Sequence, residues 1–189
     1  MEDINKKMSI DELQDTWQLA TKMHDGQKYG GSNQGEQIEY INHIGSVVFE
    51  IMTALTYESD MNSNLAIKCA ILHDTIEDTD LLYQDILNRF GHEVANGVLA
   101  LTKNENIEGK REKMLDSLNR IKEQPKEIWA IKMADRIANL YAPPFYWTNE
   151  KKKEYLEEAC LIHKQLQNGN KYLEVRLANK IVEYQKFID

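Results

Sequence analysis

Residues 71–79 read Ile71-Leu72-His73-Asp74-Thr75-Ile76-Glu77-Asp78-Thr79 (ILHDTIEDT), so an apolar run gives way to one imidazole and three carboxylates. The run belongs to a segment, 62–75, whose hydrophobic content predicts a mostly buried helix. On a helix, residues three or four apart share a face, so His73 lies beside Glu77 and Asp74 beside Asp78. Carboxylates gathered in this way repel one another unless a cation compensates. The stretch predicts either a group of metal ligands at the end of a buried helix or a solvated acidic face.

Most of the remaining chain carries the hydrophobic period of helices. Ser9 and Glu12 have the spacing of a capping box and predict the start of the first helix. Pro125 suits the first turn of a helix, and Pro143-Pro144 stops it. The other expected helices span 42–57, 62–75, 80–90, 92–102, 109–124, 125–140, 150–167 and 171–187. The pattern predicts an all-α fold of about eight to ten helices, formed by a single domain over residues 1–189.

The sequence carries no comparable signal for β-strands. No segment alternates polar and apolar residues over any length, and no internal repeat or low-complexity tract occurs. The Gly-rich segment Gly26–Gly35, GQKYGGSNQG, predicts an irregular loop between the first two helices.

The overall charge limits the partners. The chain has 189 residues, of which 42% are hydrophobic, and 23 Lys and Arg against 31 Asp and Glu give a net charge of −8. A nucleic-acid polymer is therefore not an expected partner, because binding one needs a broad basic surface. A small anionic ligand is compatible with this charge if local cations or a metal hold it.

Cysteines and hydropathy indicate a reducing, non-membrane location. Cys69 and Cys160 both lie in apolar helical patterns, which predicts two buried free thiols instead of a disulfide. No apolar run exceeds four residues, so no transmembrane helix or secretory leader is expected. The chain is expected to be cytoplasmic, and the sequence leaves its oligomeric state open.

A His-Asp pair cannot fill a coordination sphere, so further ligands must come from elsewhere. His43 begins a predicted helix just after the Gly-rich loop, and Asp135 lies inside an otherwise apolar helix with Asn139 one turn later. A buried carboxylate without a partner is costly, which makes Asp135 a candidate. Two imidazoles and two carboxylates suit Mn²⁺ or Fe²⁺ better than a thiolate-type zinc site. The alternatives are a helix-terminal hydrogen bond for His43 and an Asp135-Arg136 ion pair.

The ordered series His43, His73-Asp74, Asp135 resembles the signature of HD-domain metal-dependent phosphohydrolases, which are helical proteins. The additional Glu77-Asp78 pair resembles the hydrolase domain of the RelA/SpoT alarmone enzymes. The similarity covers about residues 14–180 and is carried by the segments ATKMHDGQ, EYINHI, ILHDTIEDT, FGHEVANGVLALTK and IKMADRIANL. The chain has no length for the further domains of the long enzymes, so it is most similar to the small alarmone hydrolases.

This resemblance implies a function and a set of roles. The implied reaction is the Mn²⁺-dependent removal of the 3′-pyrophosphate of (p)ppGpp, giving GDP or GTP, with Mn²⁺ replaceable by another divalent transition metal. It implies that the metal is bound by His43, His73, Asp74 and Asp135. It also implies that Glu77 and Asp78 orient or deprotonate the attacking water. It places Asn139 and Tyr155 at the nucleotide, with Lys28 and Lys110 near its phosphates.

The positions at which this sequence departs from the family pattern lie around the expected nucleotide site. Tyr29 stands where the family has an arginine associated with the base, and an aromatic ring there predicts a stacking contact. The loop from Gln27 to Tyr40 is longer than is usual, and Ile44 replaces the proline after the metal histidine. The alternatives are therefore an HD phosphohydrolase for another phosphorylated nucleotide, or a non-catalytic nucleotide-binding module.

Overall fold

The computed structural model describes residues 9–188, which fold into ten α-helices and one two-stranded sheet. The elements are α1 (Ile10–Met23), β1 (Lys28–Gly30), β2 (Gln37–Glu39), α2 (Ile41–Tyr57), α3 (Ser63–Leu72), α4 (Thr75–Asp78), α5 (Tyr83–Phe90), α6 (His92–Leu101), α7 (Lys110–Lys122), α8 (Lys126–Asn139), α9 (Asn149–Leu166), α10 (Lys171–Tyr184) and a 3-10 turn (Gln185–Phe187). The all-α prediction and its helix number are confirmed.

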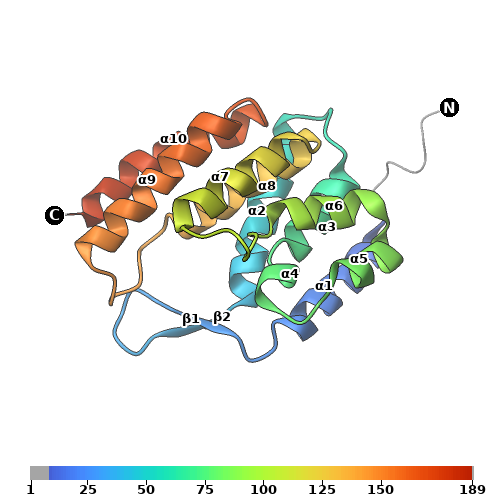
Figure 1. Cartoon of the computed structure of the whole chain (residues 1–189), viewed down its shortest axis with the longest axis horizontal. Coiled ribbons are helices and arrows are strands. Elements are labelled where there is room, and N and C mark those ends of the chain that lie inside the picture. The colour runs from blue at the N-terminus through green and yellow to red at the C-terminus, as the bar shows by residue number, and fades with distance from the viewer. Residues whose placement is uncertain (1–8, 189) are drawn as a thin grey trace.

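Helices α2, α3 and α8 pack against one another in the middle of the molecule (Figure 1). Helices α9 and α10 cover one side, whereas α1, α5 and α6 lie on the other. Helix α8 is buried at every position from Glu127 to Ile137 except Trp129, as its apolar sequence requires. Within residues 9–188, no helix is both long enough and apolar enough to cross a bilayer.

The predicted helix over 62–75 is interrupted. Helix α3 ends at Leu72, with His73 as its C-cap, and Asp74 is the N-cap of the short helix α4. The Thr75 hydroxyl donates to the Leu72 carbonyl (2.7 Å) and so satisfies an acceptor where the helix breaks. Glu77 and Asp78 thus lie in the first turn of a new helix, away from the negative end of α3.

The Gly-rich segment is not the irregular loop predicted from its composition. Lys28–Gly30 pairs antiparallel with Gln37–Glu39, with Tyr29 opposite Ile38. Gly35 helps to close the hairpin in the left-handed region (φ 79°), which favours glycine. Strands of three residues are too short to show a period of two, so the sequence pattern could not reveal them.

Two smaller predictions are also wrong in part. The Ser9 hydroxyl does accept from the Glu12 amide (3.4 Å), but the Glu12 carboxylate pairs with Lys68 of α3 instead of completing a capping box. Cys69 is buried and Cys160 is exposed, and both are free thiols.

Gly97 shows how closely α6 approaches α3 and α8. A Cβ at Gly97 would lie 2.6 Å from Cδ1 of Ile128 and 3.0 Å from Sγ of Cys69. We expect Gly97→Ala to lower the free energy of unfolding by about 1–2 kcal/mol, because overpacking outweighs the gain in helix propensity. Urea denaturation would measure this loss. Ile128→Val removes the clashing methyl group, so the double variant should be more stable than the sum of the two single changes predicts; strict additivity would contradict this explanation.

Candidate functional site

The four predicted metal ligands come together from three helices. His43 lies in the first turn of α2, His73 and Asp74 join α3 to α4, and Asp135 lies in α8. His43 Nε2 is 3.3 Å from His73 Nε2 and 3.5 Å from both Asp74 Oδ2 and Asp135 Oδ1. His43, His73 and Asp135 each offer a ligand atom within 4.8 Å of the others. His43, His73 and Asp135 are buried, so these three residues do not belong to a solvated face and could together hold a metal ion.

Neighbouring groups hold the ligand atoms in orientations that suit a metal. His73 Nδ1 lies 2.8 Å from the Ala70 carbonyl, so Nδ1 donates to that carbonyl and Nε2 is the ring nitrogen that faces the cluster. The Asp135 carboxylate accepts from Lys132 Nζ (2.9 Å) and Asn139 Nδ2 (2.7 Å). Two imidazole nitrogens and two carboxylate oxygens fit a divalent cation of the Mn²⁺ or Fe²⁺ type.

The Asp135-Arg136 ion pair considered from sequence is not formed. Asp135 pairs with Lys132, whereas Arg136 donates to Glu158 (3.2 Å) and stacks on the Tyr155 ring at 4.0 Å. Arg136 and Asp135 are neighbours in sequence but point to different partners.

Protonation of the histidines is tied to the carboxylates. Burial alone would lower the pKa of His43, but hydrogen bonds to Asp135 and Asp74 outweigh it and raise this pKa to about 10. The pKa of His73 is also raised, because the Asp74 charge overcomes its burial. The pKa of Asp135 is lowered despite burial, through Lys132 and His43. Without metal, the carboxylates therefore favour the protonated form of the imidazoles, and the imidazoles favour the ionised form of the carboxylates.

Metal uptake should consequently release protons at neutral pH. His43 must lose its proton to become a ligand, so apparent metal affinity is expected to rise with pH up to about 10. Calorimetric titration with Mn²⁺ at pH 7.5, in buffers of different ionisation enthalpy, measures the number of protons released. Injection of Mn²⁺ into each buffer alone is the control. Zero proton release on binding would contradict this protonation state.

Glu77 and Asp78 lie beside the cluster and are held differently. Glu77 accepts from the Lys103 amide (2.9 Å) and from Lys103 Nζ. Tyr40 donates towards both Asp74 Oδ2 (2.7 Å) and Asp78 Oδ2 (3.0 Å), so it links the ligand set to this pair. Burial, followed by the Asp74 charge, raises the pKa of Asp78. Glu77 is thus held in place by Lys103, and the raised pKa of Asp78 makes that carboxylate suited to take up a proton.

Sequence reasoning assigned no role to Tyr40 or Lys103. Both lie within segments that carry the family resemblance, Tyr40 in EYINHI and Lys103 at the end of FGHEVANGVLALTK. Their presence in those motifs was the available signal. Their contacts depend on residues 34 and 26 positions away in the chain, which spacing alone does not reveal.

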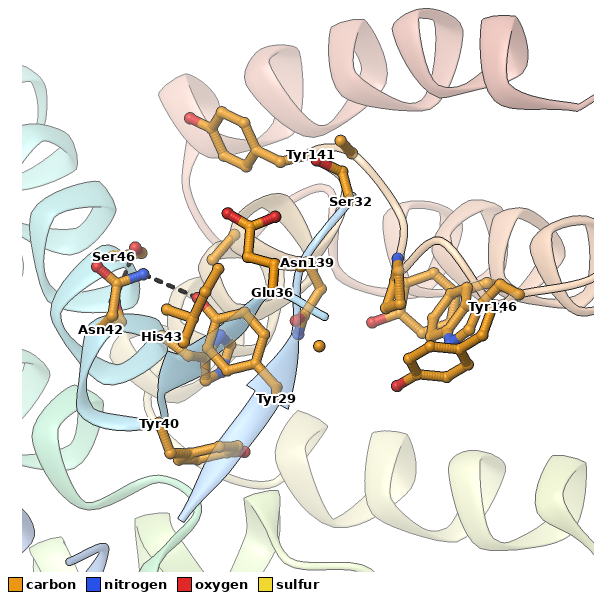
Figure 2. A pocket seen from close by; sticks show the side chains of 18 residues that line it. Tyr29, Ser32, Glu36, Tyr40, Asn42, His43, Ser46, Asn139, Tyr141 and Tyr146 are labelled. Carbon is orange, nitrogen blue, oxygen red and sulfur yellow. Dashed lines mark hydrogen bonds between the residues drawn. The ribbon is translucent and has the colours of Figure 1, made fainter. Parts of the chain in front are cut away.

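Two adjoining cavities open beside the cluster and share Tyr40, His43, Asn139 and Tyr155. The first, of about 500 Å³, is lined mainly by aromatic and small side chains from the β1–β2 hairpin, α2 and the segment 138–147 (Figure 2). The second, of about 510 Å³, is polar. Six cationic side chains line the polar cavity: Lys103, Lys110, Lys113, Lys132, Arg136 and Lys151. Six carboxylates also line the polar cavity: Asp74, Glu77, Asp78, Glu105, Asp135 and Glu158. The arrangement provides an aromatic compartment and a charged compartment, and His43, Asp74 and Asp135 lie in the wall of the charged one.

The residues predicted to contact the nucleotide line one or both cavities, with one exception. Tyr29 lines the aromatic cavity, Lys110 lines the polar cavity, and Asn139 and Tyr155 line both. Lys28 lines neither and pairs with Glu39 at 2.7 Å on the exposed side of the hairpin. Successive strand residues point to opposite faces, so placing Tyr29 in the cavity turns Lys28 away from it.

Lys151 is a further cation that sequence reasoning missed. It lies in the first turn of α9, with Nζ 5.6 Å from the centre of the Trp147 ring. Within residues 9–188, neither Lys110 nor Lys151 forms an ion pair, whereas Lys103, Lys113, Lys132 and Arg136 each contact a carboxylate. Lys110 and Lys151 are therefore the cavity cations best able to bind an anion.

Comparison with known proteins places the chain among alarmone hydrolases, although no family model matches it. It is 30% identical over 146 residues to guanosine-3′,5′-bis(diphosphate) 3′-pyrophosphohydrolase MESH1 of Drosophila melanogaster, covering 75% of this chain and 79% of that protein. It is also 30% identical to human MESH1 over 147 residues, with the same coverage. A bacterial guanosine-3′,5′-bis(diphosphate) 3′-pyrophosphohydrolase from Aquifex aeolicus is 32% identical over 170 residues, but these make up only 23% of its length.

A solved structure agrees with these relatives. The structure of "a metazoan ortholog of SpoT" that "hydrolyzes ppGpp and plays a role in starvation responses" superposes with a TM-score of 0.77 at 25% identity. The match covers 94% of this chain and 97% of that one, so it includes the helices that carry the ligand cluster. The expected HD-type helical fold is confirmed, and the chain belongs to the family of MESH1-type guanosine-3′,5′-bis(diphosphate) 3′-pyrophosphohydrolases.

Proposed function

We propose that this chain hydrolyses the 3′-pyrophosphate of ppGpp and pppGpp with Mn²⁺, releasing pyrophosphate and leaving GDP or GTP. The observation that carries the proposal is the group formed by His43, His73 and Asp135 with Asp74 beside His73. His43, Asp74 and Asp135 line the same polar cavity as Glu77 and Asp78, and His43 also lines the aromatic cavity. Membership of the MESH1-type family supports the same reaction.

The two cavities suit the two ends of such a substrate. Lys110 and Lys151 would hold phosphate groups in the polar cavity, where local cations offset the repulsion from a chain of net charge −8. The nucleoside would then lie among the aromatic side chains of the other cavity. Asn139 and Tyr155 line both compartments and are placed to contact the ribose between them.

The reaction forms a bond from a water oxygen to the phosphorus that is linked to the ribose 3′ oxygen, and the bond from that phosphorus to the 3′ oxygen breaks. A divalent ion held by His43, His73, Asp74 and Asp135 would polarise the phosphoryl oxygen and lower the pKa of the attacking water. Glu77, anchored by Lys103, would orient the attacking water, and Asp78, with its raised pKa, would accept the proton. Tyr40 fixes Asp78 relative to Asp74, so the acceptor stays in place.

The decisive assay is a nucleotide panel containing ppGpp, pppGpp, their adenine analogues and ordinary triphosphates. We expect pyrophosphate release from ppGpp and pppGpp with Mn²⁺, loss of activity after chelation, and recovery when Mn²⁺ is restored. Release of phosphate from another nucleotide with ppGpp left intact would replace this proposal with the related-nucleotide alternative. Binding of ppGpp without turnover of any panel member would favour a non-catalytic module.

A further inference from the structure

The aromatic cavity contains one carboxylate that the proposed reaction does not use. Glu36 lies in the turn between β1 and β2, and Figure 2 shows it among the lining side chains with Tyr29 and Asn139. Within residues 9–188, no lysine or arginine lines this cavity. A phosphate group would therefore be repelled here, whereas a neutral ligand that donates hydrogen bonds would be attracted.

Glu36 is held in place by its own turn. Its Oε2 accepts from the Asn33 amide (3.1 Å) and from Asn33 Nδ2 (3.2 Å). Gly31 leaves the space that the side chain fills, since a Cβ there would lie 2.1 Å from Oε2. Oε1 has no hydrogen-bond partner within residues 9–188, so the carboxylate is anchored through one oxygen and open through the other.

Tyr29 provides a rigid aromatic surface in the same cavity. Asn42 Nδ2 donates to the Tyr29 hydroxyl (2.8 Å), and the ring packs edge-on against Tyr40 with centroids 6.3 Å apart. Any nucleic-acid base can stack on an aromatic ring, because every base has a π-face, so stacking alone does not distinguish one base from another. The choice between bases must come from groups that contact the base edge, and Glu36 is the open charged acceptor available.

We propose that Glu36 reads the Watson–Crick edge of guanine in this cavity and so determines base specificity; this rests on the proposed function for the nature of the ligand. Guanine presents two adjacent donors, N1–H and the N2 amino group, to an acceptor-only carboxylate. Adenine presents an unprotonated N1 at the same place, which the carboxylate repels. The phosphates of the nucleotide would then extend to Lys110 and Lys151 in the polar cavity.

The test compares wild type with Glu36→Gln, using guanosine and adenosine 3′,5′-bis(diphosphate) as probes. Calorimetric binding to chelator-treated protein gives dissociation constants that do not require turnover. Wild type should bind the guanine nucleotide more tightly than the adenine nucleotide, and Glu36→Gln should reduce that ratio by roughly 10-fold or more. With Mn²⁺, the same variant should raise KM for the guanine nucleotide and leave kcat nearly unchanged.

Glu39→Gln is the matched control, because it makes the same change on the same hairpin at a residue that pairs with Lys28 and lines neither cavity. It should retain the wild-type base preference. Gly31→Ala, whose methyl group displaces Glu36, should lower the preference with the carboxylate still present.

An unchanged ratio in Glu36→Gln, or an equal loss in Glu39→Gln, would overturn the inference while leaving hydrolysis intact. A guanine preference that depends on Glu36 in a protein that hydrolyses neither nucleotide would instead refute the proposed function alone. The two failures are therefore distinguishable.

Discussion

Replacing Asp74 by alanine should abolish turnover because the protein no longer holds its metal ion. The Asp74 carboxylate lies 2.9 Å from His73 Nε2 and 3.5 Å from His43 Nε2, so its removal takes a ligand from the centre of the cluster. It also frees the Tyr40 hydroxyl, which orients Asp78. Removing a residue that only hydrogen-bonds to a metal ligand lowers metal affinity about 10- to 100-fold. For Asp74, a ligand itself, we therefore expect metal affinity to fall at least about 100-fold.

Equilibrium dialysis with Mn²⁺, followed by metal analysis, measures the loss directly, and circular dichroism establishes that the helices remain. Asp80→Ala is the matched control, because Asp80 is exposed, lies close by in the chain and lines neither cavity. It should bind metal and turn over substrate as wild type does. Full metal content in folded Asp74→Ala would remove Asp74 from the ligand set.

Replacing Glu77 by alanine should leave the metal bound but slow the reaction. Glu77 is joined to Lys103 and makes no contact with His43, His73 or Asp135, so the ligand cluster stays intact. Without the Glu77 carboxylate, the attacking water is no longer held in position. A displacement of about 1 Å from the reactive geometry lowers the rate about 100-fold. The measurement is kcat with ppGpp at saturating Mn²⁺, together with the metal content of the same sample.

Glu105→Ala is the corresponding control, since it removes a carboxylate from the same polar cavity at an exposed residue that pairs with Lys113. Its kcat should stay within a few-fold of wild type. If Glu77→Ala lost metal to the same extent as Asp74→Ala, the division between metal ligands and water-handling residues would be wrong.

The helices were largely predictable because their apolar residues recur with a helical period that tertiary contacts reinforce. Helix α8, predicted over 125–140 and observed over Lys126–Asn139, shows this for a buried element, and α2 for one beside the site. The hairpin was not predictable, since three-residue strands carry no readable period and the Gly-rich composition favours a loop. The end of α3 was predicted at about Thr75 and lies at Leu72, and the four-residue helix α4 was not predicted, because so short an element shows no helical period.

The sequence predicted which residues of the site lie together, but only part of their surroundings. His43, His73, Asp74 and Asp135 were proposed as ligands from the ordered motif; the first two and Asp135 form one group, and Asp74 lies beside His73. Lys28 faces solvent with Glu39, because the strand register that places Tyr29 in the cavity turns its neighbour outward.

The sequence by itself determined the helical fold, the family and the four candidate ligands, since all three are encoded in local periodicity and in an ordered set of motifs. Only the tertiary structure decided which charges meet. The contacts of Lys103 with Glu77 and of Tyr40 with Asp74 join residues from separate elements, and Lys151, 16 positions beyond Asp135 in the chain, reaches the polar cavity from α9. Side-chain pairing is a property of distance in space, and spacing along the chain fixes that distance only within one helix or hairpin.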